Sequence, residues 1–284
     1  GFFYVLGSGY RRTSDSMLEY FRKRYQDEAK GLKTPDEAGK IVVKNKKKLP
    51  LYQLKISPDG KRIAWVSNDL GKWKVYVYNL ETNKRKRISK GGSRNALQAT
   101  DYNYPQIAWN PDNQRIAVLS ERRDVPRLAM IDLATGKREH SNLSPEFQRV
   151  FSMDFITSTE IALSAAVKGY SDLFIYRTIT RQTERITQDF WDDLDATVLT
   201  IDGRKSLIFS SNRTADTLVT AKIDTILPVG QFDVFLYDLE SRSPELVRLS
   251  DTPNADERFG SGLDSSHFVF LSDASGIWNR QAGK

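Results

Sequence analysis

Residues 51–89 read LYQLKISPDGKRIAWVSNDLGKWKVYVYNLETNKRKRIS, in which short apolar runs alternate with turn residues. The apolar runs cover 51–56, 62–67, 73–80 and 84–89. SPDG at 57–60 is a turn sequence, because Pro presets φ, Asp bonds its own backbone and Gly supplies a positive φ. ETN at 81–83 forms a second hairpin turn. Val and Tyr alternate at 75–78 with the period of a strand, so the stretch predicts four antiparallel strands.

The same unit recurs along the rest of the chain. It returns at 104–138, at 150–187 with a first turn that lacks Pro and Gly, at 196–250 with an insertion, and in part at 259–284. The first-turn positions are Gly60, Asn113, Ser158, Gly203 and Ser265. Their spacing fits propeller blades, which repeat about every 40–50 residues. The lack of helical patterns between the strands excludes parallel βαβ folds. The sequence therefore predicts an all-β fold, a β-propeller with four complete blades and one partial blade.

Residues 1–50 differ from the repeats and are expected to form a separate segment before the propeller at 51–284. The apolar run at 2–6 is expected to form one strand. Ser16-x-x-Glu19 matches a capping box, which places the start of a short helix there. Gly31 is expected to end that helix, 34–39 to add one turn, and the basic residues at 44–48 to form a tether. The apolar face of the helix would consist of Met17, Leu18, Phe21 and Tyr25.

Composition excludes several classes of protein. The 284 residues include no Cys, which rules out disulfide scaffolds, thiolate nucleophiles, zinc ribbons and iron–sulfur sites. No stretch approaches 18 uninterrupted apolar residues, so no transmembrane helix is expected. The net charge of +7 arises from short basic runs, such as 84–87, that alternate into strands. We interpret these runs as solvent-exposed surface rather than a nucleic-acid site, for which steep salt dependence would be diagnostic.

The repeats resemble a known family. The pattern S/N-P-D-G/N-x-R-I-A, followed by a strand ending Y-[ND]-L-x-T, is similar to the PD40 (WD40-like) repeats of TolB-like propellers in Gram-negative envelope proteins. It is carried by residues 57–64, 78–82, 110–117, 131–136, 201–204 and 237–240. The resemblance covers about 50–284 and implies the propeller fold. It also implies a periplasmic or outer-membrane-associated location.

A second resemblance concerns the N-terminal segment. YFRKRY at 20–25, followed directly by PD40 repeats, looks like envelope proteins in which a peptidase-MA-like metallopeptidase region precedes a TolB-like propeller. The HExxH zinc motif of that region has no counterpart here, so its activity is not carried over. Because the fifth blade is partial and a propeller must protect its edge strands, we expect the sequence to be part of a longer polypeptide.

The sequence lacks the common catalytic and cofactor-binding motifs. The sequence has two histidines, His140 and His267, both expected to be surface or strand residues. It contains no Gly-x-Ser-x-Gly elbow, HExxH, EF-hand loop, Walker A motif or Rossmann fingerprint. We therefore expect no catalysis, cofactor or metal in this chain.

Candidate binding residues gather in loops at one end of the predicted propeller. These loops lead into each innermost strand or join the second and third strands of a blade. Aromatic, arginine and carboxylate side chains there suit recognition of a protein or peptide. The candidates are Arg94, Tyr102, Tyr104, Arg149, Trp191, Asp192, Asp193, Asp195 and Arg258. In the alternative interpretation, Tyr104 and Trp191 pack between blades and the acids cap strand ends.

Two further features stand out at this end. Asp192, Asp193 and Asp195 supply oxygen ligands of the kind calcium needs, although their spacing lacks a Gly turn. The insertion between Asn212 and Phe232 is long for a blade loop and is expected to fold over the rim or contact a partner. Its apolar positions are Leu218, Val219, Ile223, Ile226, Leu227 and Val229.

These features predict a non-catalytic propeller that serves as a protein–protein interaction scaffold of the cell envelope. Its partner would be a protein or peptide segment, not a nucleic acid. The alternative is the accessory or gating propeller of a larger peptidase, with a metallopeptidase upstream or a prolyl-oligopeptidase-like hydrolase downstream. The sequences that flank this chain would distinguish the two.

Overall fold

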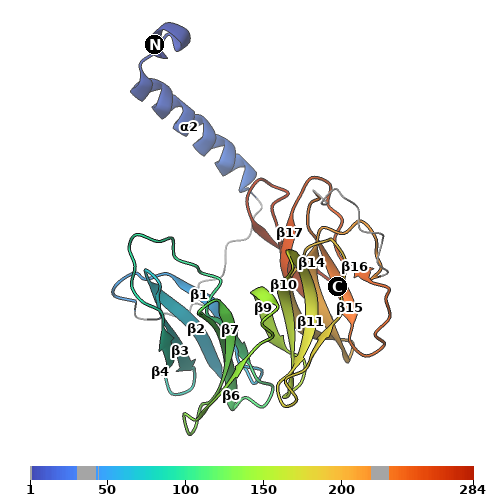
Figure 1. Cartoon of the computed structure of the whole chain (residues 1–284). Coiled ribbons are helices and arrows are strands. Elements are labelled where there is room, and N and C mark those ends of the chain that lie inside the picture. The colour runs from blue at the N-terminus through green and yellow to red at the C-terminus, as the bar shows by residue number, and fades with distance from the viewer. Residues whose placement is uncertain (1, 31–42, 44, 219–229) are drawn as a thin grey trace. The chain divides into compact units, whose positions relative to one another are not determined.

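The computed structural model describes residues 2–30, 43, 45–218 and 230–284. The chain divides into two compact units, Gly1–Lys47 and Lys48–Lys284, which are described separately (Figure 1). None of the described helices is both long enough and apolar enough to span a membrane.

The first unit is helical. Helix α1 (Phe2–Leu6) replaces the strand expected at 2–6, and helix α2 (Tyr10–Glu28) follows it. The strand prediction was wrong because a strand needs a neighbour to pair with, whereas a helix satisfies its backbone groups internally. Gly7, at φ +64°, ends α1 by donating its N–H to the carbonyl of Phe3 at 2.9 Å.

Helix α2 also begins earlier than the capping box indicated. Its N-cap residue is Gly9, and Ser16 lies within the helix rather than at its start. The apolar residues of α2 that were expected on one face, Met17, Leu18, Phe21 and Tyr25, are all exposed. Gly31, the turn at 34–39 and Lys44 lie outside the described residues.

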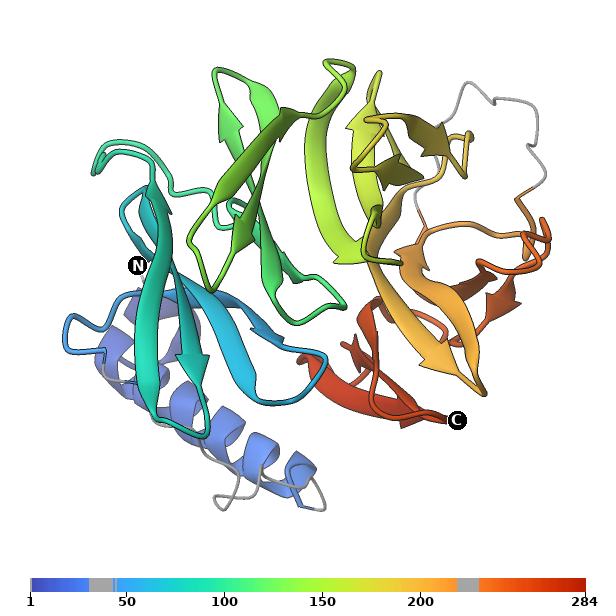
Figure 2. The ribbon, with the colours of Figure 1, turned by 90° about the horizontal axis from the view of Figure 1, so that it is seen from below.

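The second unit contains five antiparallel sheets, which confirms the predicted propeller of four complete blades and one partial blade. In each sheet the strands are ordered as in the sequence, and the sheets follow one another around a common centre (Figure 2). Blade 1 comprises β1 (Leu51–Ile56), β2 (Arg62–Asp69), β3 (Lys72–Asn79) and β4 (Lys84–Gly91). Blade 2 comprises β5 (Gln106–Trp109), β6 (Arg115–Arg122), β7 (Val125–Asp132) and β8 (Arg138–Asn142).

The remaining blades follow the same plan. Blade 3 comprises β9 (Phe147–Phe155), β10 (Glu160–Val167), β11 (Tyr170–Arg177) and β12 (Thr183–Arg185). Blade 4 comprises β13 (Asp193–Ile201), β14 (Arg204–Ser211), β15 (Asp233–Asp238) and β16 (Val247–Arg248). Blade 5 has the three strands β17 (Glu257–Gly262), β18 (Phe268–Ser272) and β19 (Asn279–Gly283).

The first turn of each blade forms as its chemistry dictates. The N–H of Gly60, at φ +70°, donates to the carbonyl of Ser57 at 2.8 Å. The turn of blade 3 lacks Pro and Gly, and there the hydroxyl of Thr157 accepts the N–H of Glu160 at 3.1 Å instead. A side-chain oxygen thus replaces a glycine as the turn-forming device.

The core lies between the blades. In the described residues, one cluster of buried apolar side chains fills each junction between consecutive blades. The second strands supply much of it, as with Val66 of blade 1 and Ile116 of blade 2, which belong to the same cluster. The innermost strands β1, β5, β9, β13 and β17 all contribute residues to a cavity of about 250 Å³ on the propeller axis. This packing holds the inter-blade loops at one end of the ring, which we call the rim face.

Candidate functional site

A pocket of about 280 Å³ opens on the rim face between blades 1 and 2. One wall is the indole of Trp73, which lies against the backbone of Gly91 so closely that a Cβ there would come within 2.2 Å of the ring. The pocket also includes the connection between β2 and β3, at Leu70 and Gly71, and the loop that leads into blade 2. Glycine at 91 therefore lets the tryptophan form a flat wall.

The charged residues that line this pocket are the carboxylates of Asp101 and Glu121. Two arginines stand close to it. Arg149 Nη2 donates to both carboxylate oxygens of Asp101 at 2.9 Å, and Arg94 Nε pairs with Asp69 at 3.2 Å. Arg94 is exposed and Arg149 is half-buried with 41% of its side chain accessible, so these ion pairs contribute little to stability. They leave guanidinium groups at the margin of a pocket that is itself acidic.

The two tyrosines predicted for this site have different environments. Tyr104 is buried, with 7% of its surface exposed, and its hydroxyl accepts the N–H of Val150 at 2.8 Å. Its carbonyl accepts the hydroxyl of Tyr52 at 2.8 Å, and burial raises the pKa of Tyr52 to about 12. Tyr102 is exposed and meets the ring of Tyr52 edge-on at 5.5 Å. Tyr104 thus holds the loop in place, and Tyr102 is available to a ligand.

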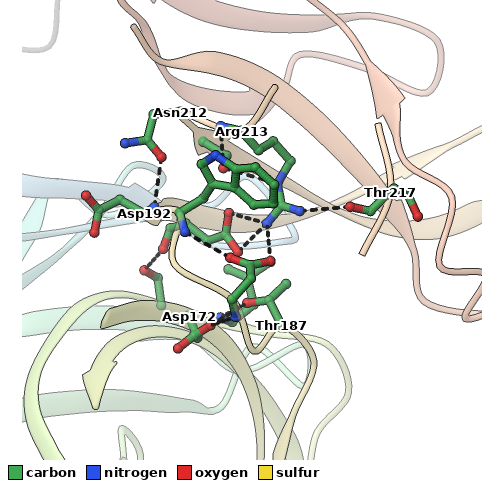
Figure 3. Close-up of polar contacts among 12 residues, drawn as sticks. Asp172, Thr187, Asp192, Asn212, Arg213 and Thr217 are labelled. Atoms are coloured by element: carbon green, nitrogen blue, oxygen red, sulfur yellow. Dashed lines mark hydrogen bonds and ion pairs between the residues drawn. The ribbon is translucent and has the colours of Figure 1, made fainter. Parts of the chain in front are cut away.

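A second group of predicted residues lies at the junction of blades 3 and 4, around Arg213 (Figure 3). Arg213 Nη2 lies 2.7 Å from both carboxylate oxygens of Asp193 and 3.4 Å from Asp189. Trp191, with 6% of its surface exposed, packs beside the same guanidinium, whose Cζ lies 5.6 Å from the ring centroid. Trp191 and Asp193 are therefore buried, and the neighbouring Asp192 is half-buried.

The cluster holds one more carboxylate. Asp172 pairs with Arg185 and accepts a hydrogen bond from the hydroxyl of Thr187 at 3.3 Å. Burial raises the pKa of Asp172, and burial together with the charge of Asp193 raises the pKa of Asp189 to about 6. The carboxylates of Asp172, Asp189 and Asp193 converge as metal ligands would. Arg213 and Arg185 already supply the positive charge there, so this donor set fits a buried ion-pair network.

The last two predicted residues face each other across blades 4 and 5. Arg258 Nε pairs with Asp195 at 2.8 Å, and its guanidinium lies 4.9 Å from the ring centroid of Phe232. Asp193 and Asp195 thus have different arginine partners, so the arrangement does not support a calcium site at Asp192, Asp193 and Asp195. The nine predicted residues fall into three places rather than one site.

Several residues of these sites were missed by sequence reasoning. Arg213, Asp172 and Asp189 lie in three different segments, and no motif links them. Trp73 was also missed, but a sequence signal for it exists. The pair Gly91-Gly92 indicates a place where another group, here the indole of Trp73, lies close to the backbone. In the blade 4 insertion, Leu218 packs against the core between blades 3 and 4, and Thr217 forms an isolated antiparallel β-bridge with Glu245. The positions from Val219 to Val229 lie outside the described residues.

The histidines lie apart from these places. His140 is exposed on β8. His267 Nδ1 lies 2.9 Å from Asp264 Oδ1 and 3.1 Å from the hydroxyl of Ser266. One ring nitrogen thus faces both groups, whereas a nucleophile–base–carboxylate relay uses the two nitrogens separately.

Two curated proteins are similar in sequence to parts of this chain. No protein-family model matches the chain. Dipeptidyl-peptidase 5 of Porphyromonas gingivalis is 31% identical over 159 residues, which is 50% of this chain and 22% of that protein. The Tol-Pal system protein TolB of Alcanivorax borkumensis is 35% identical over 74 residues, which is 26% of this chain and 15% of that protein. The chain thus spans less than a quarter of either curated relative.

Solved structures show the same architecture. TolB from Acinetobacter baumannii superimposes with a TM-score of 0.55 at 14% identity, over 82% of this chain and 54% of that one. The β-propeller domain of the Trilobed protease from Pyrococcus furiosus has a TM-score of 0.55 at 16% identity, over 82% of this chain and 67% of that one. The resemblance to TolB-like propellers expected from the repeats is confirmed at the level of fold.

Proposed function

We propose that this propeller is a non-catalytic protein-recognition module that binds a segment of a partner protein on its rim face. The observation that carries the proposal is the pocket between blades 1 and 2, a formed hollow with exposed aromatic and arginine side chains beside it. Tyr, Trp and Arg are the residue types that dominate binding energy at protein interfaces. Tyr102 and Arg94 are the exposed members of the predicted set here, and Arg149 is half-buried.

The pocket favours a basic group on the partner. Of the two carboxylates that line it, Asp101 is paired with Arg149, so Glu121 is the group that would face the basic side chain, and the amides of Asn68, Asn95 and Gln98 add polar edges. The walls formed by Trp73 and Tyr104 suit a cation, because aromatic faces attract positive charge. Arg94 and Arg149 at the margin would engage acidic groups that flank the basic side chain. The proposed partner segment therefore carries a lysine or arginine with acidic neighbours.

The proposed location is the periplasm or the periplasmic side of the outer membrane. Its support is the TolB-like fold and the local identity to a protein named for the Tol-Pal system. The partner would then belong to an envelope complex.

A second candidate function is favoured by the 31% identity to dipeptidyl-peptidase 5. In this case the chain is the accessory or gating propeller of a larger peptidase. Determination of the intact mass of the natural polypeptide, with peptide mapping at both ends, separates the candidates. A hydrolase or zinc-peptidase domain next to this chain would favour the second, and additional blades alone would favour the first.

Site-specific photo-crosslinking in cells tests the rim face directly. A benzoylphenylalanine at Tyr102 is expected to capture a discrete partner, whereas the same probe at Gln182, in the turn between β11 and β12 at the opposite end of blade 3, is not. Glu121→Gln combined with Arg149→Gln should weaken the captured complex about tenfold, as expected from loss of about 1.4 kcal/mol of binding energy. Equal capture at both positions would exclude the rim face as the binding surface.

A further inference from the structure

The positive charge of the propeller is concentrated in one blade. Residues 48–95, which form blade 1 and its flanking loops, contain 12 Lys and Arg against 3 Asp and Glu. Residues 96–284 contain 20 Lys and Arg against 27 Asp and Glu, so the other blades together carry a net negative charge. Blade 1 is therefore a basic sector in an otherwise acidic ring.

Within blade 1 the basic side chains gather on the two outer strands. Lys72 is exposed and Lys74 is half-buried on β3. Lys74 lies directly opposite Lys90 in the ladder between β3 and β4. Like charges in directly opposite positions repel each other, so this arrangement lowers stability unless an anion lies against it. The exposed cations of β4 itself are Lys84, Arg85, Lys86, Arg87 and Lys90.

The carboxylates of this sector do not neutralise the outer strands. Glu81 pairs with Lys61 at 3.0 Å, and Asp69 pairs with Arg94 at 3.2 Å. Asp59, the third carboxylate, accepts hydrogen bonds inside its own turn. In the described part of the chain, five cations of β3 and β4 take part in no ion pair: Lys72, Lys74, Lys84, Arg87 and Lys90.

Protection of an edge strand does not account for this number of charges. Charged side chains on the outer strand of a sheet do discourage pairing with other chains. The outer strands of blades 2, 3 and 4 nevertheless carry one Lys or Arg each. Each of these has a partner within the chain: Arg138 donates to a backbone carbonyl, Arg185 pairs with Asp172, and Arg248 pairs with Asp233. The unpaired cations of blade 1 therefore indicate an anionic partner outside the chain.

The aromatic residues distinguish a lipid surface from a nucleic acid. Proteins that bind single strands stack bases on aromatic rings. On the face of β3 that carries Lys74, Tyr76 is half-buried and its ring stacks on Trp65 at 5.7 Å, so it is not available to a base. The phosphate groups of a lipid surface need only the cations.

The first unit, taken by itself, supplies the second observation. Helix α2 exposes a group of apolar and aromatic side chains, in which Phe21 and Tyr25 stack on each other at 5.9 Å. The same helix exposes Arg11, Arg12 and Arg22. Basic residues together with an apolar, aromatic stripe are typical of helices that lie in the interface of a bilayer. A nucleic acid would leave this stripe in water.

We propose that blade 1 docks by its outer strands on the surface of an anionic phospholipid bilayer. The ammonium groups of Lys84 and Lys90 and the guanidinium of Arg87 contact lipid phosphates. Lipid anions also relieve the repulsion between Lys74 and Lys90. The contributions of separate Lys and Arg residues add at such a surface, and salt screens them.

Sedimentation of the full chain with vesicles tests the proposal. Vesicles of equal parts phosphatidylcholine and phosphatidylglycerol should bind the chain, vesicles of phosphatidylcholine alone should bind it at least about tenfold more weakly, and added NaCl should release it. A variant with Lys84→Gln, Arg87→Gln and Lys90→Gln should bind the anionic vesicles at least about tenfold more weakly than the unaltered chain.

The matched control removes the same total charge from other blades. Arg122, Arg204 and Arg280 are exposed on blades 2, 4 and 5, and their joint replacement by Gln should leave vesicle binding within about twofold of the unaltered chain. Thermal melts establish that both triple variants are folded. Equal losses in the two triple variants would overturn the proposal, because total charge rather than the blade 1 edge would then govern binding.

Two other results would also overturn it. One is equal binding to vesicles with and without phosphatidylglycerol. The other is binding of a labelled DNA duplex as tight as that of the anionic vesicles and lost in the blade 1 variant, which would assign the edge to nucleic acid. Glu121→Gln combined with Arg149→Gln leaves the net charge unchanged and should weaken partner capture at the rim pocket but not vesicle binding. Failure of one proposal is therefore distinguishable from failure of the other.

Discussion

Arg213 Nη2 lies 2.7 Å from each carboxylate oxygen of Asp193, and both side chains are fully buried. Asp193 begins the innermost strand of blade 4, and Arg213 follows the second strand of the same blade. Arg213 Nη1 also donates to the carbonyl of Thr217 at 3.1 Å, in the first part of the insertion (Figure 3). One guanidinium thus ties the insertion to the innermost strand.

Replacement of this arginine should be severely destabilising. Arg213→Met leaves Asp193 and Asp189 buried without their cation, and loss of one partner of a buried ion pair costs about 3–5 kcal/mol. Urea unfolding of the full chain measures the effect. Arg242→Met is the matched control, because Arg242 pairs with Glu184 on the surface, where a pair contributes less than about 1 kcal/mol. Similar losses for both variants would contradict the assigned role of Arg213.

Asp189 should make stability depend on pH. Its pKa of about 6 in the folded chain exceeds the ordinary value of 3.8, so folding favours its protonated form. The corresponding stabilisation is complete below pH 4 and is lost as the pH rises through 6, by up to about 3 kcal/mol. The charged groups facing Asp189 are Asp172, Asp193 and Arg213.

Asp189→Asn removes this titration. The variant should be more stable than the unaltered chain at pH 7.5, and the difference should shrink toward pH 5. Thermal melts between pH 5 and pH 8 measure the trend. Asp192→Asn, on the same loop but not among the partners of Arg213, should follow the unaltered chain. A lower stability of Asp189→Asn at pH 7.5 would show that the contact with Arg213 outweighs the burial of charge.

The glycine pair opposite Trp73 should tolerate no side chain. Gly92 has φ +67°, and a Cβ there would lie 2.1 Å from the carbonyl oxygen of Gly71. Gly92→Ala is expected to cost more than about 2 kcal/mol, because left-handed strain and a backbone clash combine. Gly60→Ala is the control: its φ is +70° but the space around it is open, so only the strain of about 1–2 kcal/mol applies. Chemical denaturation gives the free energy of unfolding of each variant, and the excess loss in Gly92→Ala over Gly60→Ala measures the backbone clash.

The hydroxyl of Tyr104 should stabilise the loop that leads into blade 2. Tyr104→Phe leaves the buried N–H of Val150 without that acceptor, which costs about 1–2 kcal/mol. Tyr102→Phe removes a hydroxyl from an exposed ring and should change the free energy of unfolding by less than about 0.5 kcal/mol. Equal effects would mean that the hydrogen bond to Val150 contributes nothing net.

Strands and turns of the propeller were predictable because their signals are local. SPDG at 57–60 and NPDN at 110–113 define tight turns without reference to the rest of the chain. The run at 2–6 shows the limit, since an apolar run of five residues fits a strand or a helix and only a pairing partner decides between them.

The candidate sites were predictable in part. The positions of the loops follow from the order of strands, so the rim location of Tyr102 and Arg149 could be inferred. The burial of a side chain in these loops could not be inferred, because burial depends on neighbours that are distant in the sequence. Trp191 is covered through Arg213, and Tyr104 through Tyr52 and Val150.

The sequential order of strands in every sheet has a consequence for biosynthesis. Each blade closes by hairpins between adjacent strands, and apolar clusters join each blade to the one made just before it. Among the described strands, each pairing within a blade joins strands that follow one another in the sequence. A chain that emerges from a ribosome or a translocation pore can therefore complete blade 1, add blade 2 to its apolar face, and continue in order. Such stepwise growth keeps little more than one apolar sheet face uncovered at a time.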